Sequence, residues 1–167
     1  MVDSGDWFTV EFRGVSRPRD AFLNAPFHYW ARAALITVFG SNLWTVRILS
    51  ALFSTGVLGL VCWWAHRLAG FYAALAAGAL FLTTYQFVYI HGARTGELEP
   101  LVAFFLLLGA MTFSRALERG SSFIPQHLCI VALLGLRSPL ALIPALCDLA
   151  LLIGFPAGRT RLWDWLK

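Results

Sequence analysis

Long apolar runs are the feature that most limits what this chain can fold into. Of its 167 residues, 59% are hydrophobic and only 13% are charged, whereas soluble domains carry about 25% charged residues. The apolar residues gather into runs instead of alternating with polar ones. The seven tryptophans lie toward the ends of these runs, as in the aromatic belts at the lipid–water boundary. The sequence therefore predicts an all-α, polytopic bundle of transmembrane helices.

Charge and cysteine content exclude several other classes. The net charge is +4, but it is spread over loops, and no basic cluster with interleaved aromatic residues indicates a nucleic-acid partner. Cys62, Cys129 and Cys147 lie inside apolar runs without a CxxC pair. We therefore expect neither a disulfide framework nor a zinc site, and we interpret the cysteines as small core residues.

Four regions follow one another along the chain. Residues 1–24 are polar and predict an external loop, because they lack the basic and short apolar regions of a signal peptide. Residues 25–40 predict an interfacial amphipathic helix, since their apolar run is shorter than the roughly 20 residues that a span needs. Residues 41–155 predict a transmembrane bundle of about four to five helices. Residues 156–167 predict a basic cytoplasmic tail.

The bundle begins with three spans, at about residues 43–65, 68–89 and 100–116. The remaining apolar sequence is split at Arg137-Ser138-Pro139 into two short pieces that prolines interrupt. Short, broken helices of this kind often line a site at membrane depth. Asp148 lies midway along the last piece; such an acid is either paired or functional, and we assign it no role.

Positive charges indicate the orientation. His66–Arg67, Arg115–Arg119 and the arginines of the tail fall on one side, which the positive-inside tendency makes cytoplasmic. The other side carries Arg94 and Arg137 and is then external. An anionic ligand would explain why cations also collect there.

Two glutamates and an arginine precede the third span. Pro100 suits the first position of a helix, so that Glu99 falls at its positive end. In a structural interpretation, Glu97 and Glu99 cap the helix and Arg94 pairs with one of them. In a functional interpretation, a glutamate is a general base, or a ligand of a metal ion or sugar hydroxyl, at the external face.

Arg137 interrupts an otherwise apolar hairpin. Charge at membrane depth is costly, so it usually faces a cavity or a partner. A phosphate group would satisfy Arg137 or Arg94 through bidentate hydrogen bonds. The alternative is a side chain that snorkels to the interface. His28 is interpreted from its position as an interfacial aromatic residue more readily than as a ligand.

A series of segments in this order resembles the N-terminal half of a known family, the membrane-embedded GT-C glycosyltransferases that use polyprenyl-phosphate sugars. This family includes the aminoarabinose transferase of lipid A and the dolichyl-phosphate-mannose protein mannosyltransferases. The segments are "SGDWFTVEFRG", "NAPFHYW", "FGSNLWTVRILSALF", "HRLAG", "ARTGELEPLVAFFLLL" and "GLRSPLALIP".

The resemblance implies a partial GT-C-like fold in a membrane, with bacterial inner membrane expected and the active face external. The donor would be a polyprenyl-phosphate-linked sugar, and the acceptor a lipid, a glycan or a protein. Membrane lipids would be the other partners, and no nucleic acid would bind. The reaction would invert the anomeric carbon as an activated acceptor hydroxyl attacks it.

The resemblance also implies roles for single residues. The family usually reads Lys-Pro-Pro-Leu-Tyr-Tyr-Trp at residues 24–30, so Asn24 stands where a lysine would meet the lipid phosphate. The family's Lys-Gly-Pro is similar to Arg137-Ser138-Pro139, which keeps the cation. The residues expected to bind the donor phosphate are Asn24, His28, Tyr29, Arg94 and Arg137. Glu97 and Glu99 would assist the catalytic base, position the acceptor or hold a divalent cation, if one is used.

One departure bears on activity. Family members begin with a transmembrane helix, which is followed by an acidic residue that acts as the base, and Met1 aligns beyond both. We therefore expect a fragment that is inactive by itself.

The competing hypothesis is a non-catalytic membrane subunit or part of a small-solute or lipid transporter. Transporters tend to show internal repeats and polar residues at mid-bilayer. The sequence shows no convincing repeat, and Asp148 is the mid-span charge. The transferase interpretation is therefore favoured.

Overall fold

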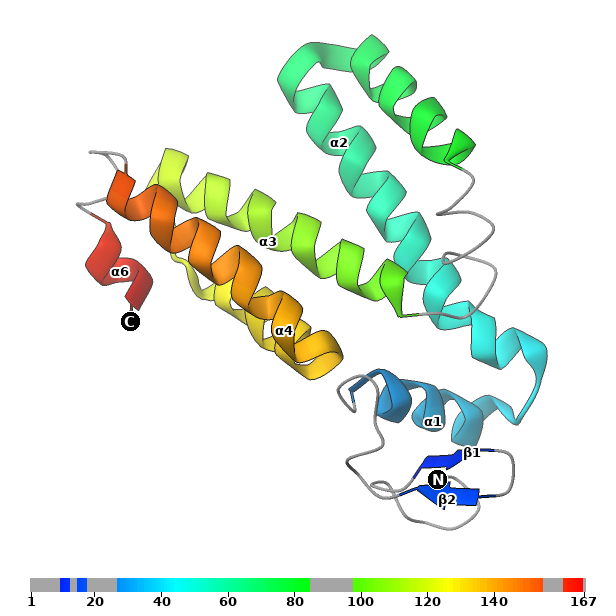
Figure 1. The fold of residues 1–167 in the computed structure, drawn as a ribbon. Coiled ribbons are helices and arrows are strands. Elements are labelled where there is room, and N and C mark those ends of the chain that lie inside the picture. Colours follow the sequence, from blue (N-terminus) through cyan, green and yellow to red (C-terminus); the bar gives the residue numbers. More distant parts are fainter. Residues whose placement is uncertain (1–9, 13–14, 18–26, 85–97, 155–160, 167) are drawn as a thin grey trace. The chain divides into compact units, whose positions relative to one another are not determined.

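A computed structural model gives the fold of the chain. It describes residues 10–12, 15–17, 27–84, 98–154 and 161–166, and for 10–12, 15–17, 137–140 and 163 it describes the backbone alone. The chain divides into two compact units, Met1–Leu101 and Val102–Lys167. Figure 1 shows the helices and strands of both units.

The first unit opens with a small hairpin and a short helix. Strand β1 (Val10–Phe12) pairs antiparallel with β2 (Val15–Arg17), so the segment expected to be a loop contains a hairpin. Valine favours extended backbone, which is consistent with these strands. Helix α1 (Phe27–Phe39) lies where the interfacial helix was predicted. It ends at Gly40, whose φ of 79° is favourable only for glycine and whose N–H donates to the Ile36 carbonyl at 2.8 Å.

Helix α2 (Leu43–Thr83) begins at an N-cap, where the Asn42 side chain accepts from the Thr45 N–H at 2.8 Å. Gly70 interrupts the helical backbone with φ 83° and ψ −169°. A Cβ added at Gly78 would lie 2.9 Å from Cys62 Sγ, although the two residues would be about 24 Å apart along a straight helix. The segment is therefore a helical hairpin that turns at Gly70, in agreement with the two predicted spans; residues 85–89 of the second span lie outside the described residues.

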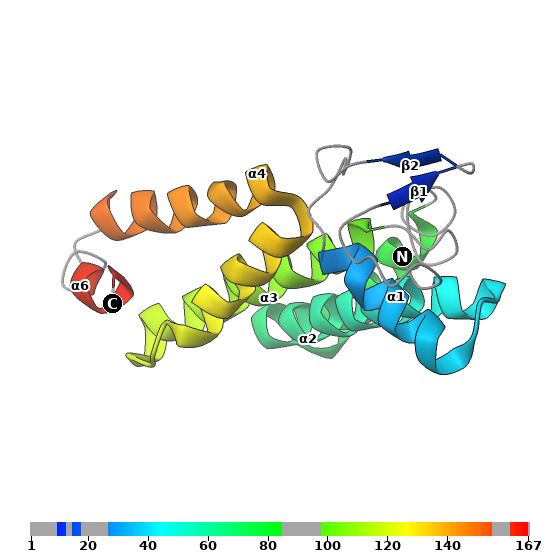
Figure 2. The same cartoon turned by 90° about the horizontal axis from the view of Figure 1, so that it is seen from below.

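The second unit contains most of α3 (Glu99–Arg119), α4 (Ile124–Gly154) and α6 (Leu162–Leu166). Helix α4 continues through Arg137-Ser138-Pro139, where the sequence predicted a break. The chain nevertheless reverses there (Figures 1 and 2). The Gln126 amide donates a hydrogen bond to the Asp148 carboxylate, 22 residues further on, whereas a straight helix would separate them by about 33 Å.

The core of the second unit forms where α3, α4 and α6 meet. Its buried members are Phe113, Ala116, Phe123 and Leu152, with Leu117, Leu162 and Trp165 packed against them. Arg161 donates to the carbonyl oxygens of Ala116 at 2.7 Å and Ser121 at 2.9 Å. The Ala116 carbonyl lies in the last turn of α3, where helices leave carbonyls without a helical partner. Residues 161–166 thus pack against the core although the sequence predicted only a tail.

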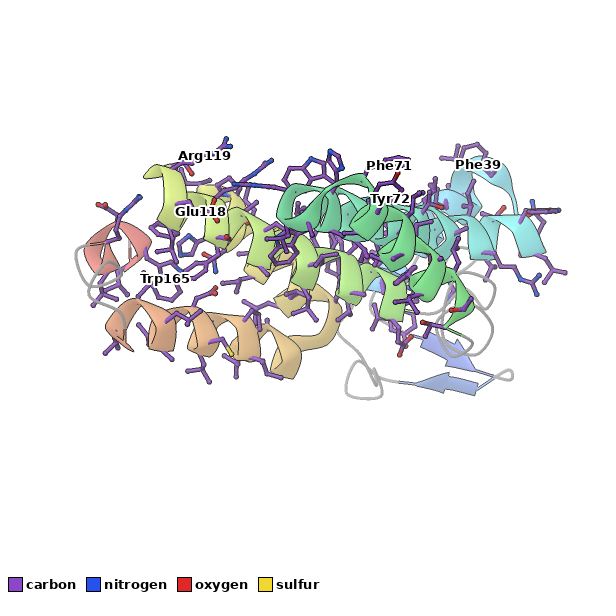
Figure 3. The ribbon with its side chains drawn as sticks, turned by 90° about the horizontal axis from the view of Figure 1, so that it is seen from above. Phe39, Phe71, Tyr72, Glu118, Arg119 and Trp165 are labelled. Atoms are coloured by element: carbon purple, nitrogen blue, oxygen red, sulfur yellow. The ribbon has the colours of Figure 1, made fainter. Side chains whose placement is uncertain are left out.

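Two helices, α2 and α3, are long and apolar enough to cross a membrane, and the two arms of α4 are shorter apolar helices. Many large apolar side chains on α2 are exposed, among them Phe71 at 61% and Tyr72 at 84%. Figure 3 shows both pointing away from the helix. Exposed aromatic side chains of this size suit a lipid environment, and the predicted all-α membrane bundle is confirmed.

The contact at Gly78 gives a test of the α2 hairpin. Gly78→Ala would push a methyl group against Cys62 Sγ, so we expect it to lower the free energy of unfolding in detergent by about 1–3 kcal/mol, as overpacking does. Gly78→Ala with Cys62→Ala removes the sulfur and should restore stability. The measurement is unfolding by a denaturing detergent, followed by circular dichroism.

Gly59 supplies the matched control, because nothing lies within 4 Å of a Cβ added there. Gly59→Ala should be neutral, or stabilising by up to about 1 kcal/mol through helix propensity. Equal effects of alanine at 59 and 78 would contradict the hairpin.

Candidate functional site

Helix α1 buries one of the predicted donor-binding residues. The His28 side chain is only 5% exposed, and its Nε2 has no hydrogen-bond partner among the described residues. The neighbouring Tyr29 is half-buried and presents its ring edge to His28, with 5.6 Å between ring centroids. A buried polar atom without a partner costs free energy unless a ligand or water satisfies it.

The surroundings of His28 keep its imidazole neutral. Burial, and then the charge of Arg32 one turn further along α1, lower the pKa of His28 from 6.5 to about 4. Burial also lowers the pKa of Arg32. At neutral pH the His28 ring therefore has one nitrogen that donates and one that accepts a hydrogen bond. It could bind a hydroxyl group or a phosphate oxygen, but it would not supply a positive charge.

The start of α3 is built as the sequence predicted. Glu99 is the first residue of the helix and is half-buried, and Pro100 follows it, fully buried. Proline suits this position because the first N–H groups of a helix have no helical partner. A carboxylate here meets the positive end of the helix dipole. Glu99 therefore has a structural role at the start of α3, in addition to any role in function.

Arg137 falls at the turn between the arms of α4. The first arm runs antiparallel to α3: the Phe113 and Phe123 ring centroids are 5.9 Å apart, and a Cβ on Gly109 would lie 3.3 Å from the Cys129 Cβ. Continuing this register brings the backbone of Arg137 level with about Val102. The turn therefore lies at the N-terminal end of the α3 segment in the second unit.

Three predicted residues, Asn24, Arg94 and Glu97, lie outside the described residues. Within the described ranges, no group of three His, Cys, Asp or Glu side chains is placed to hold a metal ion. The role of a divalent cation stays a prediction of the sequence.

A pocket at the opposite end of the second unit is a poor candidate for this chemistry. Its lining comprises Gly120, Ser121, Ser122, Phe123, Arg161 and Asp164. The Arg161 guanidinium already donates to two carbonyl oxygens, and its Nε lies 3.6 Å from the Asp164 carboxylate. These contacts use the donors that a phosphate would need.

Gln126 is a buried polar residue, 1% exposed, that sequence reasoning missed. It pairs with Asp148, whose role the sequence left open. A glutamine within an apolar run was the available signal. The cysteine interpretation is correct for the buried Cys129 and wrong for Cys147, which is exposed.

The low pKa of His28 predicts how stability depends on pH. Between about pH 6.5 and 4, His28 binds a proton in the unfolded chain but not in the folded chain. The free energy of unfolding therefore keeps its full value above pH 6.5 and decreases as the pH falls toward 4. His28→Phe should flatten this dependence. Replacing the exposed His66 with Gln should leave it in place. Detergent-unfolding curves at several pH values test this; the same slope with and without His28 would contradict it.

Comparison with known proteins connects these observations. The family model described as dolichyl-phosphate-mannose-protein mannosyltransferase matches residues 23–161, which include all the helices from α1 to α4. Neither curated proteins nor solved structures gave a match. With helices long enough to cross a bilayer, the match makes this an integral membrane protein. The chain belongs to the dolichyl-phosphate-mannose-protein mannosyltransferase family, whose members are membrane glycosyltransferases of the GT-C type.

Proposed function

We propose that the chain carries part of the donor site of a glycosyltransferase that moves a sugar from a polyprenyl-phosphate carrier to a lipid, glycan or protein acceptor. The observation that carries this proposal is the family match over residues 23–161. The reaction takes place at the external face of the membrane, which in a bacterium is the inner membrane.

The donor's phosphate is the group that the protein has to stabilise, because it leaves with negative charge when the sugar is transferred. Arg137 binds it, and Arg94 assists. An arginine can make two parallel hydrogen bonds to a phosphate, and it retains its charge in an apolar environment. Fixed cations at a site where charge develops lower the barrier most effectively when water is excluded.

The residues in and just before α1 offer neutral groups to the donor. His28 is buried, and its Nε2 has no hydrogen-bond partner in the described part of the chain, so a hydrogen bond to the donor would satisfy this atom. Tyr29 and Asn24 offer a hydroxyl and an amide nearby in sequence. Neutral donors can orient a phosphate or a sugar hydroxyl without adding charge.

The glutamates act on the acceptor side. Glu99 is held at the start of α3, and Glu97 precedes it. A carboxylate can accept the proton of the attacking hydroxyl, or orient the hydroxyl toward another base. The phosphate is a good leaving group, so no strong acid is needed. The acceptor oxygen then attacks the anomeric carbon from the face opposite the phosphate, which inverts its configuration.

The phosphate role predicts a charge-specific loss of donor binding. Arg137→Ala should weaken the binding of polyprenyl-phosphate mannose by about tenfold or more, and Arg137→Lys by less, because a lysine keeps the charge but loses the bidentate geometry. Binding to the purified chain can be measured by native mass spectrometry.

Arg119→Ala removes an exposed cation from the last turn of α3 and is the matched control, which should bind the donor normally. An equal loss in both variants would indicate nonspecific attraction to the lipid phosphate. Wild-type protein that does not bind the donor would refute the proposal.

The role of Glu99 predicts a different pattern. Glu99→Gln should leave donor binding intact but lower sugar transfer by about a hundredfold, the usual order for loss of a general base. Transfer is followed, as release of polyprenyl phosphate, in membranes that contain the full-length enzyme of which the sequence predicts this chain to be a fragment. Glu118→Gln neutralises an exposed acid near the other end of α3 and should have no effect. Full transfer activity in Glu99→Gln would assign this residue to helix capping alone.

A further inference from the structure

Gln126 joins three separate segments of the second unit. Its amide nitrogen donates to the Asp148 carboxylate on the other arm of α4. Its carbonyl oxygen accepts from Trp165 Nε1 of α6 at 3.0 Å. Gln126 is 1% exposed and Asp148 is 7% exposed. Because one end of the amide accepts from Trp165, the other end is left to donate to Asp148, and the orientation of the group is fixed.

The Trp165 side of this network is held in place independently. The Trp165 ring packs against His127, with 5.4 Å between centroids, and Figure 3 shows it pointing from α6 toward the other helices of its unit. His127 Nδ1 in turn lies 2.9 Å from the Phe123 carbonyl oxygen. Arg161, which directly precedes α6, donates a hydrogen bond to the Ala116 carbonyl oxygen in the last turn of α3. The network is therefore connected to the end of the unit where α3 ends and α4 begins.

The position of the Gln126–Asp148 hydrogen bond determines which residue stands at the turn of α4. The two residues are equidistant in sequence from Arg137. Most other residues of the two arms are apolar, and apolar packing by itself fixes the register of two helices less strictly than a polar pair does. A buried carboxylate needs its donor, since an unsatisfied polar group in an apolar surrounding is costly. A single polar pair can thus fix a register that apolar packing leaves open, as a buried asparagine does in coiled coils.

We infer that Gln126 and Asp148 are positioning residues, which hold the α4 hairpin in the register that puts Arg137 at its turn. This inference rests on the proposed function, in which Arg137 binds the donor phosphate. A slip of one residue along a helix rotates a side chain by about 100°, because there are 3.6 residues per turn. Loss of the hydrogen bond would therefore misdirect the guanidinium without removing it.

The experiment measures the register and donor binding separately. Leu128 and Leu146 are exposed, lie on opposite arms and are equidistant from Arg137. Both are replaced by cysteine and spin-labelled in a chain whose three native cysteines are alanine. Pulsed electron resonance then gives the distance between the arms, and native mass spectrometry gives the affinity for the donor, polyprenyl-phosphate mannose. The variants are Gln126→Leu, Gln126→Glu, and Gln126→Glu combined with Asp148→Asn.

We expect one narrow distance in the parent protein, and a shifted or broadened distribution in Gln126→Leu and Gln126→Glu, with donor affinity lowered about tenfold. In the combined variant, the amide introduced at position 148 can donate to the carboxylate introduced at position 126, which still accepts from Trp165. The combined variant should restore both the distance and the affinity, which general destabilisation of the core would not do.

Each other outcome is decisive. An unchanged distance in Gln126→Leu would show that the pair does not set the register. A changed distance with unchanged affinity would show that the register does not position Arg137. A parent protein with a narrow distance but no affinity for polyprenyl-phosphate mannose would refute the proposed function, while the distances would still decide the register.

Discussion

Every backbone N–H and C=O of this chain needs a partner within the protein wherever lipid surrounds it, and the rest of the structure depends on that requirement. Helices meet it within a single segment, which is why most of the described chain is helical. Exposed polar backbone is then confined to turns and helix ends. Asn42 at the start of α2 and Arg161 at the end of α3 supply partners at such ends. Ionisable side chains with a functional role are confined to the same turns and helix ends.

Reversal of direction is the second problem that an apolar helical chain has to solve, and it is solved here in two ways. In α2, the small residue Gly78 lets the returning arm approach Cys62, and Gly70 makes the turn. In α4, a buried hydrogen bond between Gln126 and Asp148 joins the arms. The first contact is steric and the second is polar. A polar pair specifies register more strictly, which suits the role proposed for Arg137 at that turn.

The elements that could be predicted from the sequence are those set by local physics. The apolar runs identified the α2 hairpin, and a short aromatic run bounded by Gly40 identified α1. Pro100 located the start of α3. The N-terminal hairpin was missed because a polar segment of few residues gives a weak strand signal. Packing of the tail against α3 was missed because the Arg161 contacts join residues about 40 positions apart.

The candidate site could be predicted only as a set of residue types. Burial of His28 and the partner of Asp148 depend on which helices pack together, and one sequence does not give that information. The sequence left the partner of Asp148 open. That partner is Gln126, which reaches Asp148 only because the two arms of α4 are antiparallel. Asn24, Arg94 and Glu97 lie outside the described residues, so their roles stay predictions of the sequence.

The most direct test of the central claim is photoaffinity labelling with a polyprenyl phosphate that carries a photoreactive group beside its phosphate. After irradiation in membranes, the labelled peptides are identified by mass spectrometry. A donor site of the kind proposed predicts labels in α1, at the start of α3 and around Arg137, and competition by unlabelled polyprenyl-phosphate mannose. Labels confined to the end that carries Arg119 and α6, or labelling without competition, would contradict the account.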